Sequence, residues 1–223
     1  MTAADLPATF ATLPAAWRAV LADWTEDDER AIVEAVRRVS GERPIGPPDP
    51  FRALRLVAPD AVKVAIFGQD PYPGPGQADG LAFSAPTSGR PSLRRIFDVL
   101  EADRPGWQRP RCGRLDAWAR QGVLLLNPTL SVEIGRSNSH DACGWRLLTS
   151  RVARSLVALF SPPMVLLWGS QAQSFWDAAL PEPARVVVLR TRHPSNDFTR
   201  GFMHEGSHFA ATGHLVDWWA LHD

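Results

Sequence analysis

The sequence predicts an α/β protein: a single domain with a central four-stranded parallel twisted sheet flanked by helices on both faces. Short apolar runs typical of buried parallel strands alternate with longer amphipathic segments, and no internal repeat or low-complexity segment interrupts the alternation. Strands that alternate with helices form parallel sheets with right-handed crossovers. The four expected strands are residues 62–67, 123–126, 164–168 and 186–190.

Helices are expected between these strands and before the first of them. Residues 92–102, 145–160 and 170–179 have the apolar spacing of helices, and residues 17–24 and 25–39 predict an N-terminal helical pair. Thr25 is the expected N-cap of the second of this pair, because four acidic residues follow it in the first turn. We expect one domain over residues 1–223, on which residues 1–50 pack as a helical and Pro-rich segment.

The composition excludes several classes of protein. With 223 residues, of which 45% are hydrophobic and 22% charged, the chain can bury a full core. Its two cysteines, Cys112 and Cys143, lie far apart, which excludes a disulfide framework and a four-thiolate metal site. The first ten residues lack the basic and apolar regions of a presequence, so we expect a cytoplasmic protein that has no contact with a membrane. The bias toward Arg over Lys, with Lys63 the single lysine, indicates a GC-rich bacterial genome.

Polar residues follow each expected strand directly. Asp70 follows the first strand, Asn127 the second, Gly169 and Ser170 the third, and His193 the fourth. Open parallel sheets bind ligands just beyond the carboxyl ends of their strands. The sequence therefore predicts a ligand site at this edge of the sheet, with a carboxylate, an amide and an imidazole.

The segment at residues 68–84 is the most informative stretch of the chain. It reads GQDPYPGPGQADGLAFS and resembles the water-activating loop of family-1 uracil-DNA glycosylases. Further motifs resemble that family in the same order along the chain: LLLN at residues 124–127, NSH at 138–140, LLWGS at 166–170, HPS at 193–195 and RGF at 200–202. Because these motifs span most of the chain, we identify it as a member of that family.

The resemblance implies an enzyme that hydrolyses the N-glycosidic bond of deoxyuridine in DNA, releasing uracil and leaving an abasic site in base excision repair. This reaction requires a base outside the double helix and stabilisation of charge on both the sugar and the leaving uracil. The resemblance assigns Asp70 to orient the water and offset positive charge on the sugar. It assigns His193 to donate to uracil O2 as a neutral imidazole.

The resemblance also assigns residues that bind uracil and DNA. Asn127 would read the N3 and O4 edge of uracil, and Tyr72 would fill the space where thymine carries its methyl group. Phe83 would stack on the ring, and Gln69 would donate a hydrogen bond to it. The expected phosphate contacts are Ser92, His140, Gly169, Ser170 and Ser195.

The loop after His193 departs from the family pattern. The family places an intercalating Leu four residues after the His, where this chain has Asp197. A carboxylate cannot fill a gap in the base stack beside phosphates, and the loop is one residue shorter before RGF, so we expect Phe198 to be the apolar wedge. Pro73 and Asp79 stand where the family often has His.

Two cofactor motifs are weak. His204 and His208 have H-E-x-x-H spacing, but Gly206 and Ser207 between them disfavour the helix that a zinc site of this type needs. The glycines of residues 74–80 are off by one from the dinucleotide fingerprint. We therefore expect no metal and no organic cofactor.

The expected partner is uracil-containing DNA, single- or double-stranded, bound by a monomer. Two alternatives stay open: a glycosylase of the same superfamily with an altered damaged-base or strand preference, and a non-catalytic protein that binds uracil-DNA. Although the chain has a formal net charge of zero, residues 85–155 hold 12 basic and 6 acidic side chains. This uneven distribution predicts localised phosphate binding with a shallow salt dependence.

Overall fold

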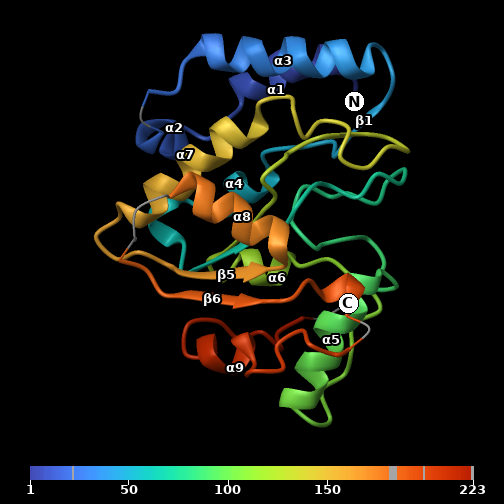
Figure 1. Ribbon diagram of the computed structural model, residues 1–223, viewed down its shortest axis with the longest axis vertical. Coiled ribbons are helices and arrows are strands. Elements are labelled where there is room, and N and C mark those ends of the chain that lie inside the picture. Colours follow the sequence, from blue (N-terminus) through green and yellow to red (C-terminus); the bar gives the residue numbers. More distant parts are fainter. Residues whose placement is uncertain (22, 181–184, 198, 222–223) are drawn as a thin grey trace.

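A four-stranded parallel sheet lies at the centre of the protein, whose structure, a computed structural model, describes residues 1–21, 23–180, 185–197 and 199–221. The strands lie side by side in the order β3-β2-β5-β6 (Figure 1). The predicted sheet is therefore confirmed. Its strands are β2 (Val64–Phe67), β3 (Val123–Leu126), β5 (Met164–Trp168) and β6 (Val188–Thr191).

Burial of the strands explains their sequence pattern, and two strand boundaries differ from the prediction. β2 and β3 are buried along their whole length, so their sequences are continuous apolar runs. β2 begins two residues later than expected, because the Val62 N–H closes a turn onto the Pro59 carbonyl. β6 is the partly exposed edge strand, which weakens its apolar signal, and it starts and ends later than predicted.

Helices cover both faces of the sheet, as predicted. In Figure 1, α7 (Trp145–Val157) and α8 (Ser170–Ala179) lie above β5 and β6, whereas α5 (Pro91–Asp103) and α9 (His208–Thr212) lie below them. Each of the helices α5, α7 and α8 buries one apolar stripe, which is why the spacing of its apolar residues could be recognised in the sequence.

The N-terminal segment forms helices that pack on this core. The first three elements are a short 3₁₀ turn followed by α1 (Leu6–Ala11) and α2 (Ala15–Val20), and α3 (Glu26–Ser40) is the long helix at the top of Figure 1. Thr25 is the N-cap of α3, because its side chain accepts a hydrogen bond from the Asp28 N–H. Phe10 of this segment stacks on Trp145 with 5.5 Å between ring centroids.

Several short elements carry too few residues to show a period in the sequence. A two-stranded antiparallel pair joins the segment after α3 to the chain after β3. These elements are β1 (Ile45–Gly46), β4 (Val132–Glu133), α4 (Arg52–Leu56), α6 (Asp116–Ala119) and the 3₁₀ turns η2 (Pro59–Ala61) and η3 (Pro194–Asn196).

Tryptophans fill much of the core and keep their indole N–H groups bonded. Trp17 donates to the Val57 carbonyl at 2.9 Å, and Trp118 donates to the Trp218 carbonyl at 2.8 Å. Such bonds allow large aromatic rings to be buried without leaving a polar group unpaired. Among the described residues, no helix is long and apolar enough to cross a membrane.

Two adjacent leucines of α7 test the packing of this helix. Leu148 is fully buried, whereas Leu147 is 46% exposed. We expect Leu148→Ala to lower the free energy of unfolding by about 2–5 kcal/mol, because it leaves a cavity between helix and sheet. The matched change Leu147→Ala should cost less than about 0.5 kcal/mol. Urea denaturation measures both, and equal losses would contradict the placement of this helix.

Candidate active site

A small cavity lies at the carboxyl ends of the strands, next to the switch point of the sheet. The chain crosses from β2 to β3 on one side and then to β5 on the other, and such a reversal leaves a crevice. The cavity volume is about 210 Å³, below the roughly 300–1,000 Å³ of drug-sized sites, so it suits a single small ring. Eight of the predicted site residues line it: Gln69, Asp70, Tyr72, Phe83, Ser92, Asn127, His193 and Ser195.

The loop at residues 68–84 starts and ends against β3. The Gly68 N–H donates to the Leu126 carbonyl, and the Ala82 N–H donates to the Leu125 carbonyl. A Cβ on Gly68 would lie 2.2 Å from Oδ1 of Asn127, so only glycine allows this amide to approach the loop so closely. The glycine thus places the Asn127 side chain at the wall of the cavity.

The Asp70 carboxylate is held by the backbone of a distant loop. Its Oδ2 accepts a hydrogen bond of 2.8 Å from the Asn138 N–H, and the Asn138 side chain accepts one of 2.9 Å from Gln69. Asn138 has φ of 58°, the left-handed conformation that asparagine tolerates better than most residues. Burial raises the pKa of Asp70 above its usual value, although the Asn138 N–H opposes this shift.

His193 is held as a neutral imidazole with a defined tautomer. Its Nδ1 accepts hydrogen bonds from the Ser195 N–H at 3.1 Å and from Ser195 Oγ at 2.8 Å. A backbone N–H can only donate, so Nδ1 carries no proton and the ring proton lies on Nε2. Burial lowers the pKa of His193 and so favours the uncharged ring. The site therefore offers an Nε2–H donor without a positive charge.

Gly169 sets the position of His193. It has φ of 102°, and a Cβ at this position would lie 2.7 Å from the His193 Cβ. The Gly169 N–H donates to the Thr191 carbonyl, which joins the end of β5 to the end of β6. Gly169 itself does not line the cavity. The structure thus gives this residue a packing function beside the imidazole, and contact with phosphate stays a prediction.

Tyr72 and Phe83 form the aromatic walls of the cavity. Phe83 is buried with φ of 64°, which is rare for a bulky residue, and its ring centroid lies 5.8 Å from that of His193. The Tyr72 hydroxyl donates to the Phe83 carbonyl at 3.3 Å. Burial raises the pKa of Tyr72 to about 12, so this phenol stays protonated.

The other residues that were predicted to contact DNA differ in their positions. Ser92, in the first turn of α5, and Ser195 line the cavity, where they are accessible to a bound ligand. Ser170 is exposed and lies in a neighbouring depression together with Arg192. Phe198, the predicted wedge, lies outside the described residues.

The prediction that His140 contacts DNA is wrong. The side chain is fully buried, and both ring nitrogens are bonded within the protein, Nε2 to Ser40 and Nδ1 to Ser131 at 2.8 Å each. Trp145 donates to Ser131, and Ser40 donates to Glu133, so one directed chain of hydrogen bonds passes through a neutral imidazole. Burial lowers the pKa of His140 to about 4, which agrees with this arrangement.

Asp79 and Asp197, which depart from the family pattern, both form ion pairs. Asp79 lies between Arg52, at 3.4 Å, and Arg114, at 3.7 Å, and it also accepts a hydrogen bond from Ser84 within its own loop. The Asp197 carboxylate accepts from Nε of Arg95 at 2.6 Å and is nearly buried. Asp79 therefore fixes the loop that carries Asp70, and Asp197 fixes the loop after His193 on α5.

The H-E-x-x-H pattern lacks the helix that it requires. Ser207 is the N-cap of α9, which begins at His208, so His204 lies outside the helix. The Nδ1 atom of His208 is bonded to the Trp168 indole at 3.2 Å in the core. The two imidazoles therefore do not form a pair on one helical face.

Sequence reasoning missed four residues that contribute to the site. Pro47 and Pro50 line the cavity from the segment before the sheet, and Arg90 lines it from the residue before α5. Asn138 was part of the NSH motif but received no role, although its backbone holds Asp70. Only Asn138 had a sequence signal, because the other three reach the cavity through tertiary packing.

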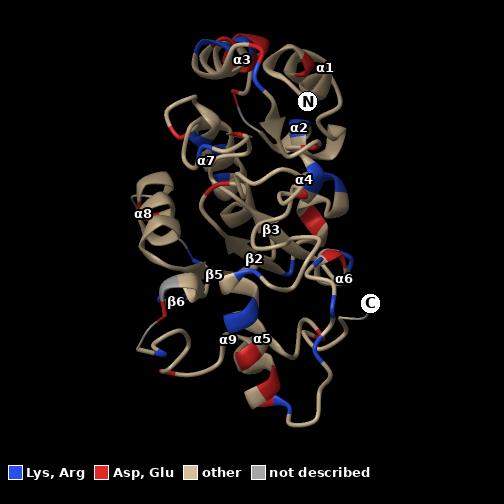
Figure 2. Ribbon diagram, turned by 90° about the vertical axis from the view of Figure 1, so that its right-hand side faces the viewer, with Lys and Arg blue, Asp and Glu red and all other residues tan. Residues whose placement is uncertain are grey.

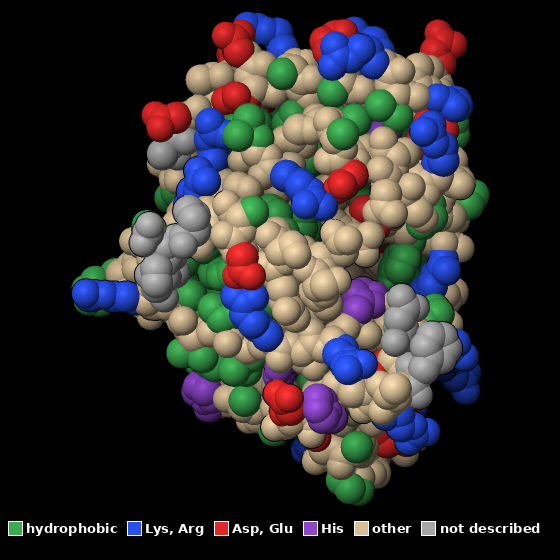
Figure 3. All heavy atoms as spheres, in the orientation of Figure 1, with side chains coloured by type: hydrophobic (Ala, Val, Ile, Leu, Met, Phe, Trp, Pro, Cys, Tyr) green, Lys and Arg blue, Asp and Glu red, His purple; other side chains and the backbone are tan. Residues whose placement is uncertain are grey.

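Charged side chains are mixed over the surface. In Figure 3, basic and acidic side chains are interspersed on the visible face, and neither sign covers it. Figure 2 shows one exception next to the site: the first turns of α5, where Arg94 and Arg95 lie, are basic and lie just below the strands.

Comparison with known proteins identifies the family of the chain. The model of the uracil DNA glycosylase superfamily matches residues 55–212. A Bordetella parapertussis protein named uracil-DNA glycosylase is 44% identical over 202 residues, which are 86% of this chain and 77% of that protein. A Salmonella agona protein of the same name is 42% identical over 210 residues, 90% of each chain.

A solved structure has the same fold. The crystal structure of mimivirus uracil-DNA glycosylase superimposes with a TM-score of 0.71 at 24% identity, covering 84% of this chain and 71% of that chain. The match of the superfamily model over most of the chain, together with relatives above 40% identity, establishes the family. The chain belongs to the uracil-DNA glycosylase superfamily.

Proposed function

We propose that the protein hydrolyses the bond between uracil and deoxyribose in DNA, releasing free uracil and leaving an abasic site for base excision repair. One observation carries the proposal: a cavity of base size contains a carboxylate and a neutral imidazole that donates from Nε2. The family membership and the names of the relatives support it.

Asp70 acts on the sugar side of the bond. As the bond to uracil breaks, positive charge develops on the sugar, and a nearby carboxylate stabilises it more strongly in a buried site than in water. The Asn138 N–H fixes Oδ2, so the carboxylate keeps its orientation while it positions the attacking water. The ionised form of Asp70 is the one that acts on the sugar, and the Asn138 N–H favours this form against the burial that raises the pKa.

His193 acts on the uracil side. Negative charge develops on uracil as it leaves, and the Nε2–H of His193 donates to uracil O2. A neutral imidazole donates this hydrogen bond without the desolvation cost of burying a positively charged ring. Ser195 holds the other ring nitrogen and therefore the tautomer.

The remaining cavity walls select the base. The Asn127 amide pairs with the N3 and O4 edge of uracil, which cytosine presents with reversed donor and acceptor positions. Tyr72 blocks the position of the methyl group of thymine, and Phe83 stacks on the ring. Gln69 donates to the uracil, with its side chain steadied by Asn138. Ser92 donates to a flanking phosphate at the mouth. Ser195 lines the same mouth, but its N–H and hydroxyl both donate to His193, so it must release one of these donors to hold a phosphate.

The protein acts as a monomer on uracil-containing DNA, in the cytoplasm of a bacterium. The Bordetella and Salmonella relatives support a bacterial setting. The chemistry above uses only protein groups and water.

Asp70→Asn tests the sugar-side role. Asparagine keeps an oxygen that accepts from the Asn138 N–H but has no charge, so uracil release from single-stranded DNA should slow by at least about 10²-fold. Folding raises the pKa of Asp70, so the protonated carboxyl stabilises the folded state at low pH. This contribution is lost as pH rises through the folded pKa, and ionised Asp70 therefore lowers the free energy of unfolding at neutral pH.

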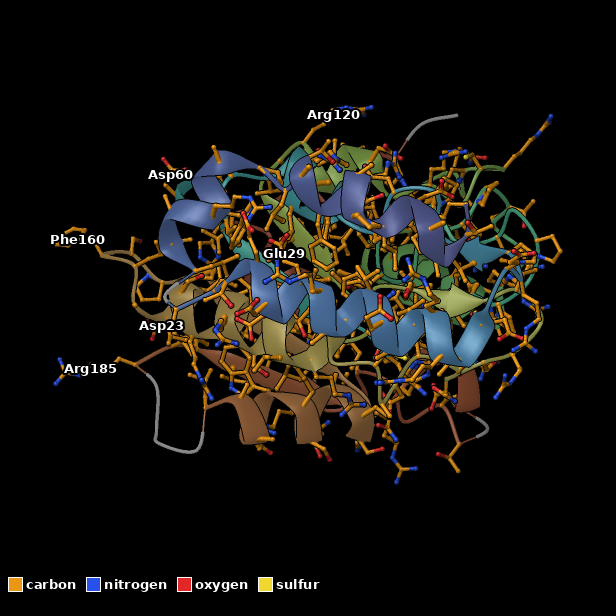
Figure 4. All side chains as sticks on the ribbon, turned by 90° about the horizontal axis from the view of Figure 1, so that it is seen from above. Asp23, Glu29, Asp60, Arg120, Phe160 and Arg185 are labelled. Carbon is orange, nitrogen blue, oxygen red and sulfur yellow. The ribbon has the colours of Figure 1, made fainter. Side chains whose placement is uncertain are left out.

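Asp70→Asn should therefore leave the free energy of unfolding at neutral pH unchanged or higher. Asp60→Asn is the control, since Asp60 projects outward at the surface (Figure 4) and should affect neither quantity. A near wild-type rate for Asp70→Asn would refute the assignment.

The pH profile tests both protonation states. The active form needs ionised Asp70, whose pKa is raised by burial, and neutral His193, whose pKa is lowered by burial. We expect kcat/KM to be constant through neutral pH and to fall on the acidic side between about pH 6.5 and 4, the usual values for histidine and aspartate. Asp141→Asn removes a negative charge that raises the pKa of Asp70, so it should move the acidic limb to lower pH. A limb centred above 6.5, or unmoved by this change, would contradict these states.

Gly169→Ala tests the packing of His193. The new Cβ would lie 2.7 Å from the His193 Cβ, so the imidazole must move, and a displacement of about 1 Å can cost about 10²-fold in rate. Gly106→Ala is a matched control with φ of 88° and open space around the new Cβ. Both variants should lose about 1–3 kcal/mol of stability from backbone strain at positive φ, but only Gly169→Ala should lower kcat. Equal kcat values for the two variants would show that Gly169 does not position His193.

A further inference from the structure

We propose that Arg90 binds a phosphate of the DNA at the mouth of the cavity. This inference rests on the proposed function and adds a charged contact to the serines assigned there. Arg90 directly precedes α5 and lines the same cavity as Asp70 and His193. Among the described residues that line this cavity, Arg90 is the only Lys or Arg.

The guanidinium of Arg90 has no hydrogen-bond or ion-pair partner within the described part of the chain. Its Nη2 atom is buried without a hydrogen bond, and the side chain forms no ion pair there. By contrast, Arg95 of the adjoining helix is paired with Asp197, and Arg114 is paired with Asp79. An unpaired guanidinium nitrogen costs free energy when it is shielded from water, and an anion at the cavity mouth would remove this cost.

Tyr72 fixes the orientation of this guanidinium. The Arg90 Cζ lies 4.9 Å from the Tyr72 ring centroid, so the cation lies over the aromatic wall of the base pocket. A stacked guanidinium loses less conformational freedom on binding, and its planar set of N–H donors matches two phosphate oxygens. Arg90 thus contacts both Tyr72, the wall that excludes the thymine methyl group, and the backbone of the DNA.

The geometry of the substrate favours phosphate as the anion. When a base enters the cavity, its sugar and the two flanking phosphates must stay at the mouth. Ser92 lies at the same mouth, two residues after Arg90, in the first turn of the 13-residue helix α5. The positive end of this helix favours a negative charge at the same place.

The test is the salt dependence of binding. The probe is a single-stranded oligonucleotide with one 2′-fluorodeoxyuridine, whose fluorine withdraws electrons from the sugar and keeps the glycosidic bond intact. Fluorescence anisotropy gives Kd between about 50 and 200 mM salt, where each phosphate contact on a single strand contributes roughly 0.7 to the slope of log Kd against log salt. The variants are Arg90→Gln, Arg90→Lys and Arg120→Gln.

We expect the slope to be lower by about 0.7 for Arg90→Gln, so that a fourfold rise in salt weakens the wild type roughly 2.6 times more than this variant. Arg90→Lys keeps the charge and should keep the wild-type slope, with a higher Kd because it loses the paired contact. Arg120 is exposed, projects outward (Figure 4) and precedes the start of β3, at the edge of the sheet opposite the cavity. Arg120→Gln should therefore match the wild type.

A wild-type slope for Arg90→Gln would overturn the inference and leave Arg90 as a packing partner of Tyr72, whatever happens to kcat. If Arg90→Gln lowers Tm, Arg90→Met provides the second neutral variant with the same aliphatic stem, and the comparison with Arg90→Lys isolates the charge. Failure of the proposed function is a separate result, because it requires that the wild type release no uracil from ordinary deoxyuridine DNA.

Discussion

Burial of the Asp70 carboxylate is the constraint on which the rest of the site depends. A carboxylate in a small cavity favours its protonated form, which could not stabilise a positive sugar. The Asn138 N–H opposes this tendency, so the loop that contains Asn138 must be held firmly. That loop follows β4, and the hydrogen bonds of His140 to Ser40 and Ser131 fix it to the end of α3 and to the chain after β3.

This dependence gives the N-terminal helices a function in catalysis as well as in packing. Ser40 is the last residue of α3, and it contacts both His140 and Glu133. Glu133 in turn forms ion pairs with Arg43 and Arg136 and is itself nearly buried. A fully bonded polar network of this kind specifies one arrangement of its loops, because each rearrangement would leave a buried polar group unpaired. The NSH motif at residues 138–140 is then explained by the position of the Asn138 N–H, since the His140 imidazole does not reach the surface.

The sequence was sufficient to predict features that depend on local periodicity and on strand ends. The sheet, its flanking helices and the convergence of Asp70, Asn127 and His193 follow from apolar runs and from the rule that parallel strands end at one edge. Features that depend on packing between distant segments could not be predicted. The burial of His140 needs α3 to lie beside β4, and the approach of Pro47 to the cavity needs β1 to pair with β4, a pairing of two residues on each side.

The distribution of charge shows why the excess of arginine in the middle of the chain does not make a cationic surface. Arg95, Arg109, Arg114, Arg136 and Arg146 all form ion pairs with acidic residues, so much of the excess serves the fold. Ion pairs that cross between loops and helices hold the site in shape, as Arg95 and Asp197 do, but they leave little charge for the phosphates. A protein that neutralises few phosphates gains little affinity from counterion release. Under the proposed function, selectivity must then come mostly from the cavity, where we propose that a wrong base leaves the Asn127 amide unpaired and that the methyl group of thymine meets Tyr72.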